Sequence, residues 1–200
     1  EEISYLASAE LPVVVVNITR GGPGLGRITP AQSDYFQATK GGGHGDYHLI
    51  VMAPASVQEM ADLTTLAFDL ADRYRIPAMI LGDGTIGQLM ENVNLADQID
   101  GPSPSSKGWS INNDPVRKRN LVLSAPFTDQ ELVELNKKLS KKYFTIKENE
   151  TRWEEYQSED AQYLIVAFGI SSRFAKAAIE ELRKEGIKTG LIRPITLYPF

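Results

Sequence analysis

Residues 13–54 read VVVVNITRGGPGLGRITPAQSDYFQATKGGGHGDYHLIVMAP, with two glycine clusters and the arginines Arg20 and Arg27 between two apolar runs. An apolar run that ends at a glycine turn is typical of a strand buried on both faces of a parallel sheet. Ligands of open α/β sheets bind just beyond the carboxyl ends of such strands. Arg20 stands at this position, beside backbone that glycine leaves uncovered. The stretch therefore predicts a site for a small anion.

The composition predicts a globular protein without a membrane span or a nucleic-acid surface. The chain has 200 residues, a net charge of -5, 24% charged residues and no cysteine. The acidic balance argues against nucleic-acid binding, and no apolar run approaches the ~18 residues of a membrane helix, so we expect a cytoplasmic protein. Without cysteine the chain can form neither a thiolate zinc site nor a cysteine-ligated iron–sulfur cluster. Any electron-transfer centre should belong to a partner.

Hydrophobic periodicity predicts an α/β fold with a parallel sheet. A helix should run from Ser56 to about Tyr74, because Ser56 and Glu59 form a capping box. Strand, helix and strand in this order imply a right-handed parallel crossover. Strands are expected over residues 13–18, 48–53 and 77–81.

A polar segment and a long helix precede a second α/β unit. Residues 92–120 are rich in proline, serine and asparagine, which predicts a linker. Thr128 and Glu131 form another capping box, and the helix that follows has the narrow apolar stripe of a helix laid across another domain or subunit. The last expected elements are strands over residues 163–168 and 187–192, with a helix between them that Ser171 or Ser172 caps and Gly186 ends.

The loop RGGPGLGR, residues 20–27, matches neither of two common phosphate-binding patterns. A Walker loop needs Lys and Ser or Thr after its last glycine, and Arg27 and Ile28 follow Gly26 here. The dinucleotide pattern fails because Arg27 occupies the place of its third glycine. What remains is Arg20 as a fork for a carboxylate or phosphate, with Thr29 as a hydroxyl donor. The alternative for Arg20 is a structural ion pair.

Two further motifs suggest metals, and in both cases a structural role is favoured. Gly82-Asp83-Gly84 followed by Asn112-Asn113 resembles the magnesium–diphosphate motif of thiamine diphosphate enzymes, but the polar residues before Asn112 cannot form the apolar strand that this motif requires. His44 and His48 lie in a glycine-rich loop rather than on a helix, which favours a flexible turn over a metal site. We expect no metal ligands.

Residues 3–63, which include the quoted stretch, and GIKTGLIRPITLYPF at residues 186–200 resemble the α subunit of 2-oxoacid:ferredoxin oxidoreductases. The resemblance runs from Ile3 to Phe200. This is the pyruvate and 2-ketoisovalerate ferredoxin oxidoreductase family, and the branched-chain members are especially similar. The resemblance implies three parts. They are a pyrimidine-type thiamine diphosphate-binding domain over residues 1–95, a linker with a long helix over 96–158, and the start of a transketolase-C-like α/β domain over 159–200.

The resemblance also implies a reaction, the CoA-dependent oxidative decarboxylation of a 2-oxoacid such as 2-ketoisovalerate to acyl-CoA and CO2, with reduction of ferredoxin. The resemblance implies that Arg20 binds the carboxylate of the 2-oxoacid and that Thr29 lies beside the substrate. It identifies no certain catalytic residue in this chain. A β subunit would hold most of the thiamine diphosphate and its Mg²⁺, and γ and ferredoxin-like δ subunits would complete the complex and its iron–sulfur clusters. The glycines expected near the cofactor are Gly21, Gly22, Gly24 and Gly26.

The sequence departs from this family at its start. The family's Tyr-Pro-Ile-Thr-Pro segment and the glutamate that activates the aminopyrimidine would precede residue 1, so we expect no activity from this chain alone. Two alternatives stay open. One is a non-catalytic assembly subunit of such a complex, and the other is an enzyme of the transketolase or dehydrogenase E1 β type.

Overall fold

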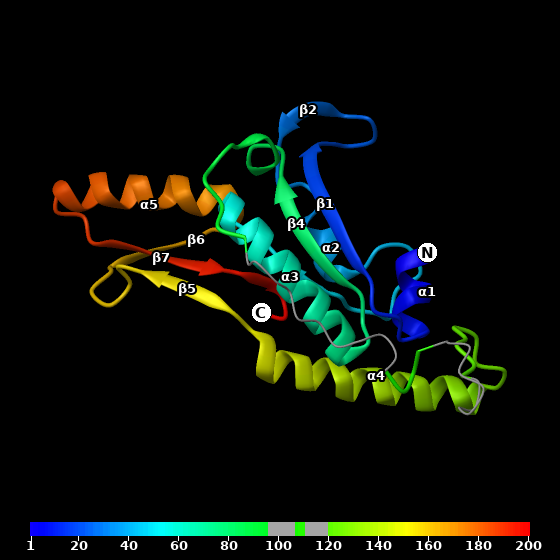
Figure 1. Ribbon diagram of the computed structural model, residues 1–200. Coiled ribbons are helices and arrows are strands. Elements are labelled where there is room, and N and C mark those ends of the chain that lie inside the picture. The colour runs from blue at the N-terminus through cyan, green and yellow to red at the C-terminus, as the bar shows by residue number, and fades with distance from the viewer. Residues whose placement is uncertain (96–106, 111–119) are drawn as a thin grey trace.

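The computed structural model describes residues 1–95, 107–110 and 120–200, and these form two sheets with helices packed on them (Figure 1). The first sheet has five strands in the order β2-β1-β4-β3-β8, and the second has three in the order β5-β7-β6. The predicted α/β class with a parallel sheet is confirmed. None of the described helices is long and apolar enough to cross a membrane.

Three parallel strands form the centre of the first sheet. β4 pairs with β1 and with β3, and every residue of β3 and β4 is buried because helices cover both faces. Short antiparallel strands complete the sheet at each side, β2 against β1 and β8 against β3. The strands are β1 (Val14–Gly21), β2 (Arg27–Pro30), β3 (Ile50–Met52), β4 (Ala78–Asp83) and β8 (Thr196–Tyr198).

Helix α3 (Val57–Tyr74) covers one face of this sheet, and α1 (Glu2–Ser8) and α2 (Tyr35–Lys40) lie on the other. On the α3 face, Leu70 packs with Ile80 in a core of fully buried side chains. The serine cap is confirmed, since the hydroxyl oxygen of Ser56 accepts the N–H of Glu59. The Glu59 carboxylate reaches back to the N–H of Ala55 rather than to that of Ser56. A short turn, η1 (Ile86–Gln88), follows β4.

Helix α4 (Asp129–Glu150) runs across the first unit beneath α3 (Figure 1). Its capping box is confirmed, with Thr128 and Glu131 bonded to each other's backbone. Ile146 is fully buried in the α3-side core, and the neighbouring Leu139 is buried as well. The narrow apolar stripe therefore serves packing on another part of the same chain.

The second sheet is covered by one helix, and its elements are β5 (Trp153–Tyr156), β6 (Tyr163–Val166), α5 (Gly169–Lys184) and β7 (Thr189–Pro194). The predicted serine cap is wrong, because α5 begins after Phe168 and the Ser172 hydroxyl donates to the carbonyl of Gly169 inside the helix at 2.7 Å. Ser171 bonds a distant glutamine instead. Gly186 adopts a left-handed φ of 82° after the helix, as predicted.

The described elements that were not expected from the sequence are β2, α2, η1, β5 and β8. Strand β5 lies inside the segment predicted as linker, and it pairs antiparallel with β7. After β7 the chain returns to the first sheet as β8, so residues 159–200 contribute to both sheets. The boundaries at residues 95 and 158 stay predictions, and most of the segment 92–120 lies outside the described residues.

Candidate functional site

The carboxyl end of β1 continues into a hairpin that projects beyond the end of β4 (Figure 1). Its loop requires glycine, because Gly26 has a φ of +52° and a Cβ there would lie 1.7 Å from the carbonyl oxygen of Gly21. Gly24 also has a left-handed φ, of +60°, but open space around it. All four residues of β2 are exposed, so the hairpin supports no core of its own.

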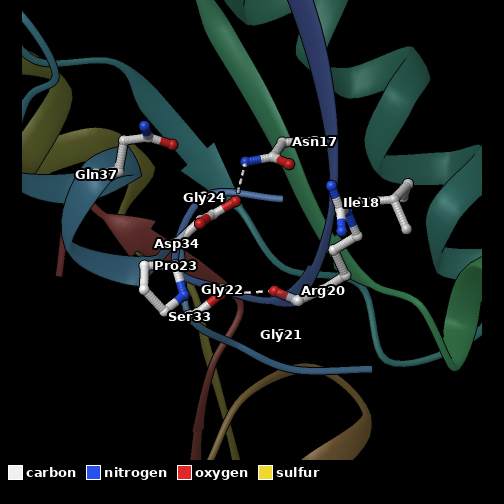
Figure 2. A pocket seen from close by; sticks show the side chains of 10 residues that line it. All are labelled: Asn17, Ile18, Arg20, Gly21, Gly22, Pro23, Gly24, Ser33, Asp34 and Gln37. Atoms are coloured by element: carbon white, nitrogen blue, oxygen red, sulfur yellow. Dashed lines mark hydrogen bonds between the residues drawn. The ribbon is translucent and has the colours of Figure 1, made fainter. Parts of the chain in front are cut away.

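A pocket of about 620 Å³ lies between this loop, the outer edge of β1 and the start of α2 (Figure 2). Its position beyond a parallel strand is the one that the sequence predicted for an anion. The lining combines backbone of the glycine loop with polar side chains and one guanidinium group. The lining residues are Asn17, Ile18, Arg20, Gly21, Gly22, Pro23, Gly24, Ser33, Asp34 and Gln37.

Arg20 is exposed and supplies the positive charge of this pocket. Its Nη1 donates a hydrogen bond to the carbonyl oxygen of Leu25, across the loop. Among the described residues it forms no ion pair, so the alternative of a structural ion pair is not observed there. A guanidinium carries five N–H donors, and one of its nitrogen atoms is held by the loop. The arrangement leaves the group oriented and able to grip a carboxylate.

Polar bonds fix the strand that carries Arg20. The Ser33 hydroxyl donates to the main-chain carbonyl of Arg20 at 2.8 Å, as Figure 2 shows. Asn17 donates to the Asp34 carboxylate at 3.1 Å, and the Thr19 hydroxyl donates at 2.9 Å to the carbonyl of the residue that directly follows β2. The segment that follows β2 forms part of the pocket wall, and hydrogen bonds to Ser33 and Asp34 hold it against β1.

The structure brings together only part of the predicted site. Arg20, Gly21, Gly22 and Gly24 line one pocket, whereas Thr29 and Gly26 do not. Thr29 lies exposed on β2, one residue before the partner of Arg20 in the hairpin register. Sequence reasoning missed the polar lining residues Asn17, Ser33, Asp34 and Gln37. The signal available was the run Gln-Ser-Asp at 32–34, directly after the hairpin.

Asp83 has a structural role in this fold. It is 3% exposed, and its Oδ1 accepts the backbone N–H groups of Thr85 and Ile86 at 2.9 and 3.1 Å. This carboxylate therefore stabilises the turn that begins η1, which supports coincidence as the origin of the Gly-Asp-Gly match. Asn112 and Asn113 lie outside the described residues. Within the described ranges, no group of three or more His, Cys, Asp or Glu could hold a metal ion.

The two histidines lie in different surroundings. His44 is exposed in the glycine loop with a φ of 54°. His48 is half-buried, and its ring stacks on Tyr198 at 4.3 Å and meets the edge of Tyr143 at 5.1 Å. Burial, with a smaller contribution from the nearby Lys40 charge, lowers the pKa of His48. This surrounding fits a packed aromatic cluster better than a metal site.

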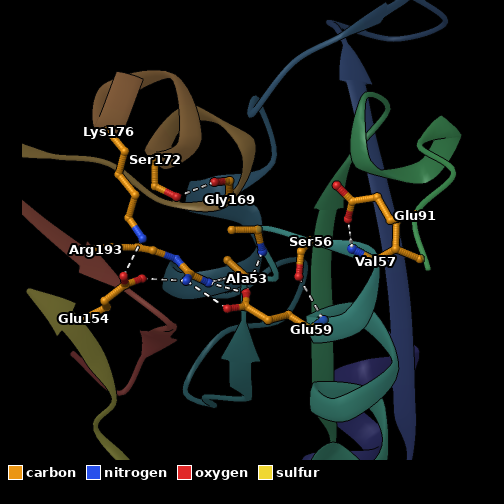
Figure 3. A network of polar contacts seen from close by, with 11 residues as sticks. Ala53, Ser56, Val57, Glu59, Glu91, Glu154, Gly169, Ser172, Lys176 and Arg193 are labelled. Atoms are coloured by element: carbon orange, nitrogen blue, oxygen red, sulfur yellow. Dashed lines mark hydrogen bonds and ion pairs between the residues drawn. The ribbon is translucent and has the colours of Figure 1, made fainter. Parts of the chain in front are cut away.

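A buried arginine joins the two units of the fold (Figure 3). Arg193 of β7 has a side chain only 4% exposed, and its Nη1 lies 2.9 Å from carboxylate oxygens of both Glu59 and Glu154. Burial alone would lower the pKa of Arg193, but hydrogen bonds and charge from the two glutamates raise it. Lys176 of α5 also bonds Glu154. The ion-pair network holds β7 and α5 against the first turn of α3.

A second ion pair spans the same junction. Arg173 of α5 pairs with Glu91 at 2.7 Å, and the other oxygen of Glu91 accepts the N–H of Val57 at 2.9 Å. Figure 3 shows this second contact at the start of α3. Salt bridges at both sides of the α3 N-terminus therefore fix how α5 is placed relative to the first sheet.

Comparison with known families accounts for both parts of this architecture. The family model of the thiamine diphosphate-binding part of pyruvate flavodoxin/ferredoxin oxidoreductases matches residues 1–162. A model of core domain II of pyruvate:ferredoxin oxidoreductase matches residues 161–200. The chain therefore belongs to the pyruvate flavodoxin/ferredoxin oxidoreductase family, and the predicted resemblance is confirmed.

Among individual proteins, ketoisovalerate oxidoreductase subunit VorB of Methanothermobacter marburgensis is 51% identical over 200 residues, which cover 100% of this chain and 56% of that protein. The 2-oxoglutarate synthase subunit KorA of Methanocaldococcus jannaschii is 34% identical, over 100% of this chain and 60% of that subunit. The chain thus spans little more than half the length of these relatives.

A solved structure supports the fold. The 2-oxoglutarate:ferredoxin oxidoreductase of Magnetococcus marinus, with 2-oxoglutarate, coenzyme A and succinyl-CoA bound, superposes with a TM-score of 0.81 at 22% identity. The match covers 100% of this chain and 40% of that chain. At this identity the likeness concerns the arrangement of helices and strands.

Proposed function

We propose that this chain is part of the α subunit of a 2-oxoacid:ferredoxin oxidoreductase, and that its pocket beside β1 binds the carboxylate of the 2-oxoacid. The reaction converts a 2-oxoacid, coenzyme A and oxidised ferredoxin into acyl-CoA, CO2 and reduced ferredoxin. The observation that carries the proposal is Arg20, a guanidinium held by a glycine loop in a pocket at a strand end. The preference for 2-ketoisovalerate rests on the 51% identity to a ketoisovalerate oxidoreductase subunit.

The residues of this chain bind and orient the substrate. Arg20 would hold the carboxylate through two parallel N–H···O bonds, the geometry that suits a planar carboxylate. The glycine loop lets the backbone approach the ligand closely. We assign Thr29 a place beside the substrate in the assembled protein, since its exposed hydroxyl has no partner among the described residues. These groups would fix the bond to the departing CO2 in a reactive orientation.

Thiamine diphosphate is the cofactor that the family model implies, and it would supply the electron sink for decarboxylation. The described residues fit one end of it better than the other. The glycine loop offers open backbone, whereas Asp83 is committed to its turn and the described residues contain no phosphate loop. We therefore propose that a β subunit holds the diphosphate and its Mg²⁺. Cysteine-bearing γ and δ partners would carry the iron–sulfur clusters.

The decisive experiment replaces Arg20 by Ala in the assembled complex. We expect the KM for 2-ketoisovalerate to rise about 100-fold, because charge-assisted hydrogen bonds are each worth about 1.5–3 kcal/mol. Arg27→Ala is the matched control, since Arg27 is an exposed arginine of the same hairpin that does not line the pocket. The assay is ferredoxin or viologen reduction over a panel of 2-oxoacids.

Each open alternative predicts a different result. An unchanged KM in Arg20→Ala would remove Arg20 from the substrate site. A complex that stays fully active with both Arg20 and Thr29 replaced would indicate an assembly subunit. Activity with NAD instead of ferredoxin would indicate an enzyme of the dehydrogenase E1 type.

A further inference from the structure

Residues 31–34 connect β2 to α2 and pass along the strand that carries Arg20. The Thr19 hydroxyl donates to the carbonyl of Ala31 at 2.9 Å. The Ser33 hydroxyl donates to the carbonyl of Arg20 at 2.8 Å. These two bonds fix the backbone of β1 at Arg20 and at the residue before it.

Gln32, between these two contacts, bonds the second unit. Its Nε2 donates to the carbonyl of Phe168 at 2.9 Å, and its Oε1 accepts the Ser171 hydroxyl at 3.2 Å. Both ends of the amide are therefore bonded to the first turn of α5. The approach is close, since a Cβ on Gly169 would lie 3.1 Å from this Nε2.

The first turn of α5 is itself firmly placed on the first unit. Arg173, directly after that turn, pairs with Glu91 at 2.7 Å. Arg193 of the adjoining β7 pairs with Glu59 (Figure 3). Gln32 thus lies between α5, which ion pairs hold in place, and β1, which carries Arg20. The bond at Ser33 completes the connection to the Arg20 backbone.

We propose that Gln32 is a positioning residue for the 2-oxoacid, which acts by holding Ser33, and through it Arg20, at a set distance from the first turn of α5. The proposal rests on the proposed function of Arg20. Gln32 does not line the pocket, so it acts through its neighbours. A bidentate arginine–carboxylate contact depends on geometry, and a displacement of about 1 Å can cost up to about 100-fold in rate.

The test is Gln32→Ala in the assembled oxidoreductase. The KM for 2-ketoisovalerate should rise about tenfold while the KM for coenzyme A stays unchanged, a split that general destabilisation would not produce. Gln58→Ala is the matched control. Gln58 is also bonded at both amide ends, to the backbone of Asn94 at 2.8 and 3.1 Å, and it has no contact with the pocket. Its replacement should leave both KM values as they are.

A double substitution shows whether Gln32 acts through Arg20. In the Arg20→Ala background, Gln32→Ala should raise the KM no further. Independent, multiplying effects would overturn the proposal, and so would a Gln32→Ala complex with the KM of the unmodified protein. If Gln32→Ala impairs assembly, Ser171→Ala removes only one of the two bonds, and its KM should rise about threefold. An unchanged KM there would overturn the proposal as well.

The two proposals fail in distinguishable ways. If Arg20→Ala leaves the KM unchanged, the substrate role of Arg20 is lost together with that of Gln32. If Arg20→Ala raises the KM and either Gln32→Ala or Ser171→Ala does not, only the positioning role is lost.

Discussion

β4 and β1 are neighbouring parallel strands with six paired positions in register, yet only β4 is buried along its whole length. β1 leaves Val16 and Ile18 exposed by 55% and 41%. The difference arises because β4 is paired with a strand on both sides, whereas β1 pairs with β2 only at Arg20 and Gly21, so the rest of its outer edge has no neighbouring strand among the described residues. The pocket that Arg20 lines lies on this outer edge.

The centre and the edge of this sheet have different roles, stability at the centre and the placement of Arg20 at the edge. The centre, β3 and β4 beneath α3, buries apolar side chains and provides the stability of the first unit. The edge, β1 and the hairpin, supports little core, so its backbone is free to adopt the left-handed turns that hold Arg20. The exposed edge also suits a site that another subunit completes, since an unpaired strand edge favours association. Chemistry at the edge and stability at the centre can therefore be altered separately.

The largest expected effect tests the centre against the edge with one type of residue. Ile80 is 0% exposed in the core and Ile28 is 89% exposed on β2. Ile80→Ala should lower the free energy of unfolding by about 3–4 kcal/mol, because it removes buried methylenes and leaves a cavity. Ile28→Ala should change it by less than about 0.5 kcal/mol. Urea unfolding of the purified protein measures both, and similar losses would show that the hairpin is part of the core.

An intermediate effect is expected within the hairpin. Gly26→Ala places a Cβ against the Gly21 carbonyl, so the loop must open and release the Leu25 carbonyl from Arg20. We expect the KM for the 2-oxoacid to rise about tenfold or more, with a loss of unfolding free energy of only about 1–2 kcal/mol. Steady-state kinetics and urea unfolding measure the two effects.

Gly24→Ala is the control for this substitution. Gly24 has a similar left-handed φ of +60° but no atom within 4 Å of an added Cβ. Its replacement should therefore show the left-handed backbone strain without a clash at the Gly21 carbonyl, with a smaller change in KM. Equal KM values for the two variants would mean that the loop does not hold Arg20 through Leu25.

The sequence predicted the centre of the sheet better than the edge, for a physical reason. The sequence signals for the centre are local patterns. They are the apolar runs at β3 and β4 and the capping residues of α3 and α4, and these elements lie where the patterns predicted them. The strand β5 reads Trp-Glu-Glu-Tyr and looked like part of a charged segment. Its Glu154 is accommodated only because Lys176 and Arg193 pair with it from distant parts of the chain.

The same distinction holds for the site. Arg20 and its glycines could be found because a strand end followed by a turn is visible in the sequence. The run Gln-Ser-Asp at 32–34 marks polar residues, but the local sequence does not show that this segment folds back along β1, where Ser33 bonds Arg20 and Asn17 bonds Asp34. The predicted serine cap of α5 is wrong for the same reason, because Ser171 bonds Gln32, which follows β2 of the first sheet, and does not cap its own helix.

The smallest expected effect concerns the covered side of the sheet, where His48 stacks on Tyr198. Burial lowers the pKa of His48, and the Lys40 charge adds to the effect. The unfolded chain therefore binds a proton at His48 at a higher pH than the folded chain does, so the unfolding free energy should fall as the pH drops below the ordinary histidine value of about 6.5.

His48→Phe keeps a ring for the stack and should remove this part of the pH dependence. Urea unfolding of the unmodified protein and of the variant between pH 8 and pH 5 measures the difference. A slope that persists in His48→Phe would place the titrating group elsewhere in the fold, and the covered side would then contribute packing without a pH-sensitive contact.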